Sequence, residues 1–445
     1  MFSITTKIRK YINSSFILIF VTISALIFAN SPWSSLYFDI WQTPIAFQIG
    51  SFNLFSHGGV PMTLMEFTND FLMAIFFFSV GLEIKREILV GELSNPKKAL
   101  LPIIGAIGGM IVPVLIYLIF SHEGDALRGA SIPIATDIAF SLGVLAMLGS
   151  RVPVGLKIFL AALAVADDLG GIIVIAFMHS GALNLFFLGL AGLVILSLTF
   201  AARRGLRSKL IYCLAGIIIW YLFLNSGIHA TIAGVIVAFC IPARPMTTSK
   251  YYVDIIRQNV QLFPQTNESV GEIHILTNEQ ISALKKIESA SDKVISPLQD
   301  LEDSLHGIVL YFIIPLFAFV NAGVNFTGMS FMNLFSGVGL SVFAGLAIGK
   351  FVGIYSFSWL AVKFKIVELP THSNWKMMAG IALLGGIGFT VSMFMANLAF
   401  GGGSPEMYEM LNNAKLAILV GSIVSGTAGY MMLDRYLPQT PNKTA

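Results

Sequence analysis

Residues 160–177, Leu-Ala-Ala-Leu-Ala-Val-Ala-Asp-Asp-Leu-Gly-Gly-Ile-Ile-Val-Ile-Ala-Phe, are apolar except for two adjacent aspartates. A helix of this length nearly spans the ~30 Å hydrocarbon core of a membrane. Charged side chains in that core are costly, and they are functional candidates by default. The stretch therefore predicts a membrane-spanning helix and a functional site at Asp167 and Asp168, of which at least one must hold a proton or a cation.

The composition extends this prediction to the whole chain. Of its 445 residues, 56% are hydrophobic and only 11% are charged, about half the charge of a typical soluble domain. We expect an all-α polytopic membrane protein whose residues 1–445 form one membrane domain with about twelve spanning helices. Because apolar runs recur along the chain, the first is taken as a span and not as a cleaved signal. The predicted spans are 14–30, 62–84, 99–120, 130–149, 154–177, 182–201, 209–224, 227–242, 306–323, 335–360, 376–399 and 412–433.

The distribution of Lys and Arg sets the orientation. With the N-terminus inside, Arg128 is the only Lys or Arg in the predicted outside loops, whereas the inside loops are rich in both. Cytoplasmic loops retain positive charge. We therefore expect both termini to be cytoplasmic.

Two segments lie outside the predicted spans. Residues 44–54 alternate apolar and other side chains around Gly50-Ser51, which predicts a small outer β-hairpin. Residues 243–305 form a long cytoplasmic segment, with a polar loop expected at 245–275 and an amphipathic helix at 278–295. Ser296 and Pro297 then provide a helix cap and a first helical residue.

The second candidate site is Ile132-Pro133-Ile134-Ala135-Thr136-Asp137, inside the fourth span. Pro133 disturbs the helix and frees backbone carbonyls near the middle of the membrane. Carbonyl, hydroxyl and carboxylate oxygens are hard ligands, which suit a small hard cation such as Na⁺ or Li⁺.

Two further charged residues lie within spans. Lys350 is far from either end of its apolar run, so we expect it to pair with Asp167 or Asp168, with snorkelling as the alternative. Asp70 follows Asn69 early in the second span, nearer its outer end, where a helix-end role is also open.

Glycines at 385, 386 and 388 predict a second interrupted helix, in span 11. Interrupted helices in the two halves of a chain, here spans 4 and 11, indicate a substrate site in a transporter with inverted-topology repeats. The half-helix ends need opposite charges, and Asp137 and Lys350 are the candidates.

These residues together resemble the bacterial NhaA Na⁺/H⁺ antiporters, in the same order along nearly the whole chain. The segment 247–297 departs from the family, whose loop is shorter there. The resemblance rests on the following motifs: Asn69-Asp70, Gly81–Glu87, Thr136-Asp137, Asp167–Gly170, Ser226–Thr231, Pro315–Phe319, Asn321–Val324 and Gly385–Phe394.

The resemblance implies specific roles for the candidate residues. Asp168 is the cation ligand and Asp167 the proton carrier that pairs with Lys350. Thr136 and Asp137 lie where the broken helices cross and join Asp168 as cation ligands.

Other parts of the resemblance concern the route to the site and its control. Asp70 lies on the second helix of the ion path. A pH-responsive group comprises Glu83, Arg86, Glu87, Glu302, His306 and His229, although Asp303 stands where the family has another histidine.

The expected function is pH-regulated exchange of internal Na⁺ or Li⁺ for external H⁺ by alternating access, in a bacterial inner membrane. We expect no enzyme activity, no cofactor and no nucleic-acid partner, but a homodimer formed through residues 44–54. Two other classes of protein also use buried carboxylates: a cation channel, for which the sequence has no repeated filter loop, and an intramembrane aspartyl protease, for which it has no Gly-x-Gly-Asp.

Overall fold

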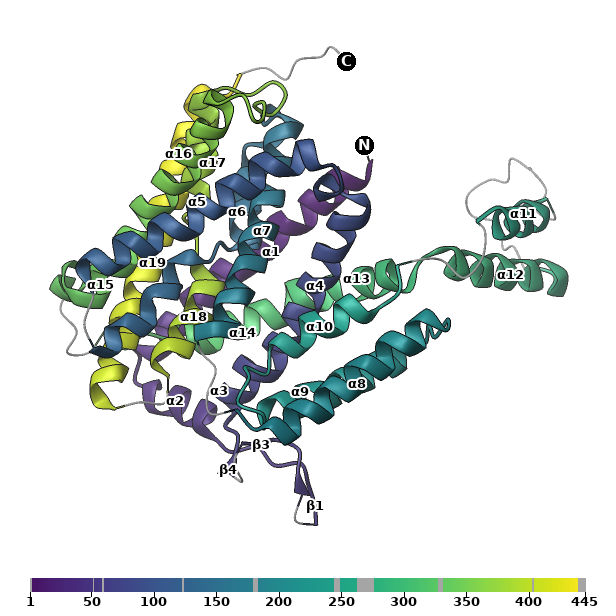
Figure 1. Cartoon of the computed structure of the whole chain (residues 1–445), viewed down its shortest axis with the longest axis horizontal. Helices are drawn as coiled ribbons and strands as arrows, with labels where there is room; N and C mark the ends of the chain where they lie inside the picture. The colour runs from purple at the N-terminus through teal and green to yellow at the C-terminus, as the bar shows by residue number, and fades with distance from the viewer. Residues whose placement is uncertain are drawn as a thin grey trace.

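The computed structural model describes residues 2–50, 52–57, 60–121, 124–178, 183–243, 249–261, 276–326, 331–401 and 404–438. These residues form a bundle of helices with two short β-hairpins at one end (Figure 1). The helices of the first half are α1 (Phe2–Ala29), α2 (Ser34–Gln42), α3 (Leu64–Phe67), α4 (Met73–Val90), α5 (Pro96–Phe120), α6 (Ile138–Met147), α7 (Val154–Met178), α8 (Leu185–Arg203), α9 (Lys209–Leu224) and α10 (Ile232–Cys240).

The second half continues the bundle after a pair of helices that projects from it. Its helices are α11 (Ser249–Val260), α12 (Asn278–Val294), α13 (Pro297–Ile308), α14 (Ile314–Asn321), α15 (Gly337–Ala344), α16 (Lys350–Lys363), α17 (Trp375–Leu384), α18 (Phe389–Phe400) and α19 (Pro405–Tyr436).

Short segments of tighter or wider helix join several of these elements. The 3₁₀ segments are η2 (Glu92–Ser94), η3 (Gly124–Ile134), η4 (Gly149–Arg151) and η6 (Phe331–Phe335). The π segments are η1 (Thr68–Leu72), η5 (Val309–Ile313) and η7 (Gly345–Gly349), and each continues directly into an α-helix. Such π segments often lie at functional sites.

Several helices are suited to a membrane. Within the described ranges, six are long and apolar enough to cross one, or up to nine if each of three bent helix pairs is one span. Each of the twelve predicted ranges contains helix, although α10 is only nine residues long. The number of twelve spans and the inverted repeats therefore stay predictions.

Close helix contacts build the bundle. A Cβ added to Gly353 of α16 would lie 2.1 Å from the carbonyl oxygen of Gly108 in α5, so these two backbones touch. Such small residues allow close packing of membrane helices. Buried apolar side chains form two clusters: a large one that includes α5, α7 and α16–α19, and a second one formed by α8–α10 with one face of α4.

The two ends of the bundle differ. Figure 1 shows both ends of the described chain at one end, which we call the terminal end, and the β-hairpins at the opposite, hairpin end. There, β1 (Gln48–Ile49) pairs with β2 (Phe52–Asn53), within the segment predicted to be a hairpin. A second antiparallel pair, β3 (Ser56–His57) with β4 (Val60–Pro61), was not predicted.

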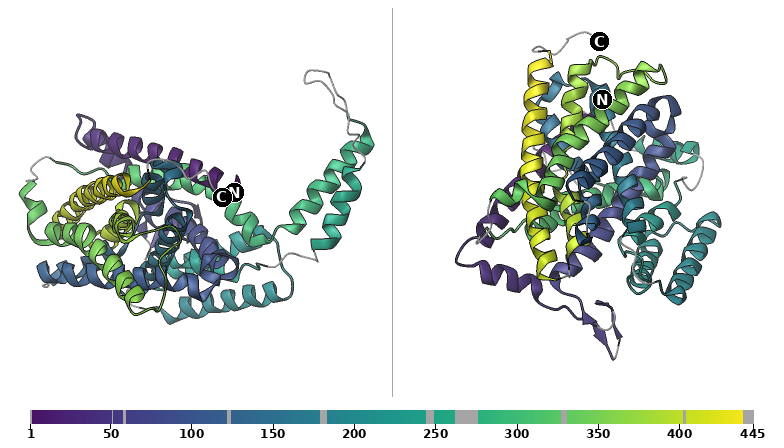
Figure 2. Two further views of the ribbon diagram at one scale, coloured as in Figure 1. Left: turned by 90° about the horizontal axis from the view of Figure 1, so that it is seen from above. Right: turned by 60° about the vertical axis from the view of Figure 1, so that its left-hand side comes forward.

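The projecting pair α11 and α12 corrects one expectation. The polar loop predicted for 245–275 is wrong in part, since it contains helix α11. Packing against α12 stabilises this helix, and Tyr252 and Ala290 are buried in the contact between the two helices. Residues 262–275 lie outside the described residues. The pair extends sideways from the bundle in both views that show it well (Figures 1 and 2).

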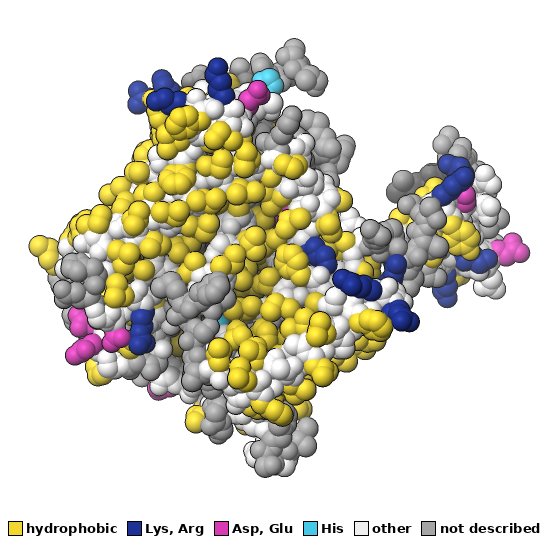
Figure 3. Space-filling view, in the orientation of Figure 1, with side chains coloured by type: hydrophobic (Ala, Val, Ile, Leu, Met, Phe, Trp, Pro, Cys, Tyr) yellow, Lys and Arg dark blue, Asp and Glu magenta, His cyan; other side chains and the backbone are white. Residues whose placement is uncertain are grey.

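The surface agrees with a membrane environment. In Figure 3 hydrophobic side chains cover most of the visible bundle, while Lys and Arg gather at its upper edge and around the projecting helices.

Candidate functional site

The candidate site lies where two interrupted helices cross. The first consists of η3 and α6, which are bent by 43° across Ala135–Asp137. The second consists of α17 and α18, which are bent by 45° across Gly385–Gly388. Both breaks lie where Pro133 and the glycines predicted them.

The two breaks satisfy each other's backbone groups. The N–H of Asp137 donates to the carbonyl oxygen of Ile387 at 2.7 Å, and the hydroxyl of Ser141 donates to that of Leu384 at 3.0 Å. In return, the hydroxyl of Ser392 donates to the carbonyl oxygen of Ile132 at 2.9 Å. Polar groups freed by the breaks thus find partners without water, as non-helical backbone inside a membrane requires.

Asp137 lies at two helix N-termini. One carboxylate oxygen accepts the N–H of Phe140 at 3.0 Å and caps α6. The other accepts the N–H and the hydroxyl of Thr390, at 3.1 and 2.5 Å, in the first turn of α18. Asp137 is therefore placed to compensate two positive helix ends, and Thr390, which was not predicted as a site residue, belongs to the crossing.

Asp167 and Lys350 are paired in the protein interior. Both side chains are 0% exposed, and the Lys350 Nζ lies 2.5 Å from the Asp167 Oδ2. The same oxygen lies 2.7 Å from the Thr136 hydroxyl, which is also 2.8 Å from the carbonyl oxygen of Gly385. A hydroxyl has one proton, so Thr136 donates to only one of these two oxygens at a time.

Asp168 has a different environment from its neighbour. Its side chain is buried, with 4% of the residue exposed, and neither carboxylate oxygen has a hydrogen-bond partner in the described part of the chain. It lines a cavity of about 50 Å³ whose wall also includes Asp137, Thr390, Glu83 and His306. A buried polar group without a partner is costly unless something binds it.

The predicted cation ligands are therefore not equivalent. Thr136 contacts Asp167, and the Asp137 carboxylate accepts hydrogen bonds from Thr390 and Phe140. Among the described residues, both carboxylate oxygens of Asp168 lack a hydrogen-bond partner. Across the described residues, no three His, Cys, Asp or Glu side chains form a metal-binding group.

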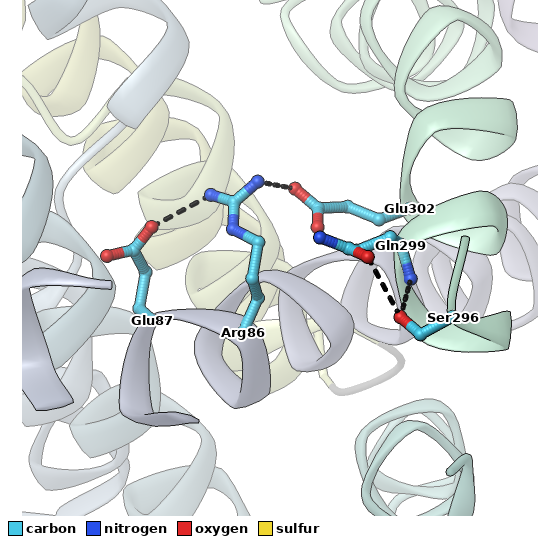
Figure 4. A network of polar contacts seen from close by, with 5 residues as sticks. All are labelled: Arg86, Glu87, Ser296, Gln299 and Glu302. Carbon is cyan, nitrogen blue, oxygen red and sulfur yellow. Dashed lines mark hydrogen bonds and ion pairs between the residues drawn. The ribbon is translucent and has the colours of Figure 1, made fainter. Parts of the chain in front are cut away.

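A second polar group lies nearer the terminal end. The Arg86 guanidinium of α4 donates to Glu87 at 2.8 Å and, with its other terminal nitrogen, to Glu302 of α13. Figure 4 shows Arg86 between the two carboxylates, with Gln299 and Ser296 beside Glu302. The structure thus brings together the two clusters that the sequence assigned to a pH response.

His229 does not belong to this group. Its Nε2 lies 3.9 Å from the Asp70 Oδ1, and its Nδ1 lies 2.8 Å from the Thr231 hydroxyl. Asp70 belongs to the π segment η1, toward the hairpin end of the bundle. Asp70 and His229 therefore form a separate polar pair on the opposite side of the crossing from Arg86.

Carboxylates and one lysine, buried where two interrupted apolar helices cross, define a multi-pass membrane protein with a candidate site for ions. Comparison with known families specifies the kind. The chain matches the family model described as Na⁺/H⁺ antiporter 1 over residues 5–433, and it belongs to this family. The resemblance seen in the sequence motifs is confirmed.

Curated relatives carry the same description. The chain is 53% identical over 433 residues to a protein of Bacteroides thetaiotaomicron named Na(+)/H(+) antiporter NhaA, with 97% of each chain covered. It is 53% identical over 425 residues to the protein of that name from Bacteroides fragilis strain YCH46, with 95% of each covered. It is 42% identical over 438 residues to Na(+)/H(+) antiporter NhaA 1 of Saccharophagus degradans, covering 97% of this chain and 92% of the relative.

Proposed function

We propose that this protein exchanges internal Na⁺ or Li⁺ for external H⁺ by alternating access, with Asp168 as the cation ligand. The observation that carries the proposal is the buried Asp168 carboxylate, which lacks a partner in the described structure and faces a cavity. The names of the relatives support the exchange of Na⁺ for H⁺.

The local charges explain why cation and proton would compete. Lys350 neutralises Asp167, and helix ends and Thr390 stabilise Asp137. Asp168 remains uncompensated, so in a low-dielectric site it must carry either a proton or a cation. Because one carboxylate cannot hold both, binding of Na⁺ on one side and of H⁺ on the other couples the two fluxes.

Asp167 is the proposed proton carrier. When Lys350 is charged, Asp167 accepts from Lys350 and from Thr136. When Asp167 is protonated on Oδ2, it can instead donate to the Thr136 hydroxyl, which then donates to Gly385. The same set of contacts accommodates both charge states, which supports a role in proton transfer.

The orientation and the access route complete the proposal. The positively charged loops support a cytoplasmic position for the terminal end, in a bacterial inner membrane. The cavity lined by Glu83, His306 and Asp168 is then the inward route, and Asp70 with His229 lies on the outward route.

Two further features belong to the proposal. Arg86, Glu87 and Glu302 would adjust the inward route as pH changes, together with Glu83 and His306 beside them and with His229 on the outward route. Residues 44–54 would form a homodimer contact on the outer side.

Reconstitution tests the proposal. Vesicles containing the protein and an imposed pH gradient should lose that gradient when Na⁺ or Li⁺ is added, and should keep it in choline chloride at several pH values. A cation channel would pass Na⁺ without this proton flux when the membrane potential is clamped. Na⁺ flux without any change in the pH gradient would therefore contradict the proposal.

A further inference from the structure

One face of α18 carries three polar or aromatic side chains in line. Thr390, Phe394 and Asn397 are spaced i, i+4 and i+7, so they lie on the same side of the helix. Thr390 is bound to Asp137 at the crossing. Phe394 and Asn397 follow it toward the hairpin end, in the direction of Asp70 and His229.

Phe394 fills the space between the crossing and the outer polar pair. Its side chain is 0% exposed. Its ring centroid lies 5.6 Å from that of Phe77, 6.3 Å from that of Phe317 and 5.7 Å from the edge-on ring of His229. A ring packed against three others fills this level with aromatic side chains, as in gates that exclude water by hydrophobic constriction.

A chain of three amides lies one turn farther out. The Asn397 amide donates to the Asn321 side-chain oxygen at 2.6 Å, and the Asn321 amide donates to the Asn69 side-chain oxygen at 2.8 Å and to the Phe317 carbonyl oxygen at 2.9 Å. Asn321 is 0% exposed and uses both ends of its amide. Buried amides need such partners, so the chain is stable only while the three helices stay together.

These contacts join two parts of the bundle. Helix α18 packs against α19 and η3, whereas α4 packs against α10 and α13. Asn397 and Phe394 are thus presented by one part, and Asn69 and Phe77 by the other. The cavity at Asp168 lies on the opposite side of the crossing, beside Glu83 and His306.

We propose that Asn321 is a positioning residue for ion exchange, which holds Asn397 and Phe394 in place and so closes the outer route to Asp168. Opening of the outer route separates Asn397 from Asn321, and water takes the place of the lost hydrogen bond. Because Thr390 is on the same helical face, the movement that opens this route also changes the contacts of Asp137. The inference rests on the proposed antiport function, because the outer route has a role only if ions pass along it to Asp168.

Thiol labelling measures this closure without measuring transport. Replacing Cys213 and Cys240 by Ala removes both native cysteines, and Ile314→Cys then places a probe in the wall of the cavity. A charged, membrane-impermeant methanethiosulfonate is applied from either side in oriented vesicles. Asn321→Ala should raise the labelling rate from outside about tenfold, as expected when one or two buried hydrogen bonds are lost, and lower the rate from inside.

Two variants complete the design. Asn397→Ala removes only the last amide of the chain of three and should change both labelling rates in the same way. It therefore replaces Asn321→Ala as the test if that variant does not insert into the membrane. Asn225→Ala is the matched control, because among the described residues the Asn225 side-chain amide donates to Tyr221 of its own helix, and its labelling should equal that of the parent.

Na⁺-dependent collapse of a pH gradient is measured on the same vesicles. The inference would be overturned if the rate of labelling from outside were the same in all four proteins, even if antiport is present. These proteins are the parent, Asn321→Ala, Asn397→Ala and Asn225→Ala. A shift in labelling without any antiport in the parent would support the closure and overturn the proposed function.

Discussion

Asp167 and Asp168 are adjacent in the chain, but they meet different surroundings because they point in different directions from α7. Asp167 meets Lys350 and Thr136, whereas Asp168 faces the cavity without a hydrogen-bond partner among the described residues. One carboxylate is thus held in place and the other is free to bind. This difference explains how two identical side chains can have separate roles.

Asp168→Asn should abolish exchange while the protein still inserts. The amide keeps the size of the side chain but removes the charge for which the cation and the proton compete. We expect Na⁺-dependent proton flux in vesicles to fall to the background of empty vesicles. Asp39→Asn is the control, since Asp39 is exposed on α2; normal transport by Asp168→Asn would contradict the assignment.

The buried ion pair gives a second prediction. Lys350→Met leaves the Asp167 carboxylate buried and uncompensated, which should cost about 3–5 kcal/mol of stability. Combining it with Asp167→Asn should recover most of that stability but no exchange. Thermal unfolding in detergent measures the first effect, with exposed Lys365→Met as the control. Equal melting temperatures for Lys350→Met and the parent would show that the pair contributes no stability.

For single residues, the sequence predicted the charged side chains of the site but not all of their partners. A charge in an apolar run is visible without a structure, so Asp137, Asp167, Asp168 and Lys350 could be found. Thr390 and Asn321 could not, because Ser, Thr and Asn also occur in spans where they bond only to their own helix, as Thr22 does. Which hydroxyl meets which carboxylate depends on how helices cross.

Among the elements, the interrupted helices and the glycine contacts determine where the site lies. The breaks were predictable because Pro removes a backbone donor and Gly weakens a helix. The π segments were not predictable, since one additional residue in a turn barely alters an apolar pattern. Helix α11 was missed because residues 249–260 are half polar and have their apolar partner in α12.

The close contact between α5 and α16 leaves no room for a side chain at Gly353. Gly353→Val would place a Cβ 2.1 Å from the Gly108 carbonyl oxygen, so the two backbones must separate. We expect the free energy of unfolding to fall by about 3 kcal/mol or more, seen as a lower melting temperature and less monodisperse protein. Gly189→Val on α8 is the matched control, because nothing lies within 4 Å of its added Cβ. Equal stability of the two variants would contradict a close contact between α5 and α16.

For the whole molecule, the polar groups form three levels along the direction from hairpin end to terminal end. Asp70 and His229 lie at one level, the crossing at the next, and Arg86 with Glu302 at the third. The sequence indicated the order of these levels through the positions of residues within spans. It could not indicate that α18 and α4 belong to different parts of the bundle, because these parts are defined by contacts between distant helices.

The hairpin at residues 44–54 gives a prediction about assembly. Phe47 is 54% exposed on this small projection, so much of its ring is free to contact a second copy of the chain. Deletion of Ile45–Leu54 should lower the dimer fraction in mild detergent more than it lowers transport in vesicles. Native mass spectrometry or light scattering measures the first quantity. An unchanged oligomer would contradict a dimer contact at this segment.

The last prediction concerns pH control at the terminal end. Arg86 is shared between Glu87 of its own helix and Glu302 of α13, and the side chain of Glu302 is only 9% exposed. Loss of the Glu302 charge removes the ion pair between Arg86 and α13, which weakens the link between α4 and α13 beside the cavity. Glu302→Gln should therefore move the pH at which transport begins by roughly one unit, the shift that corresponds to a coupling of about 1.36 kcal/mol.

The apparent cation affinity of Glu302→Gln at full activity should change little, because Asp168 is untouched. Asp300→Asn is the matched control: it removes a carboxylate from the same helix α13, but one paired with Lys209 and not with Arg86. Its pH profile should overlay that of the parent. If the profile of Glu302→Gln also overlays the parent, Arg86 and Glu302 are an ordinary ion pair between two helices. A shifted profile with an equally altered cation affinity would instead place the effect at the ion site, since a gate changes access and leaves the ligands as they are.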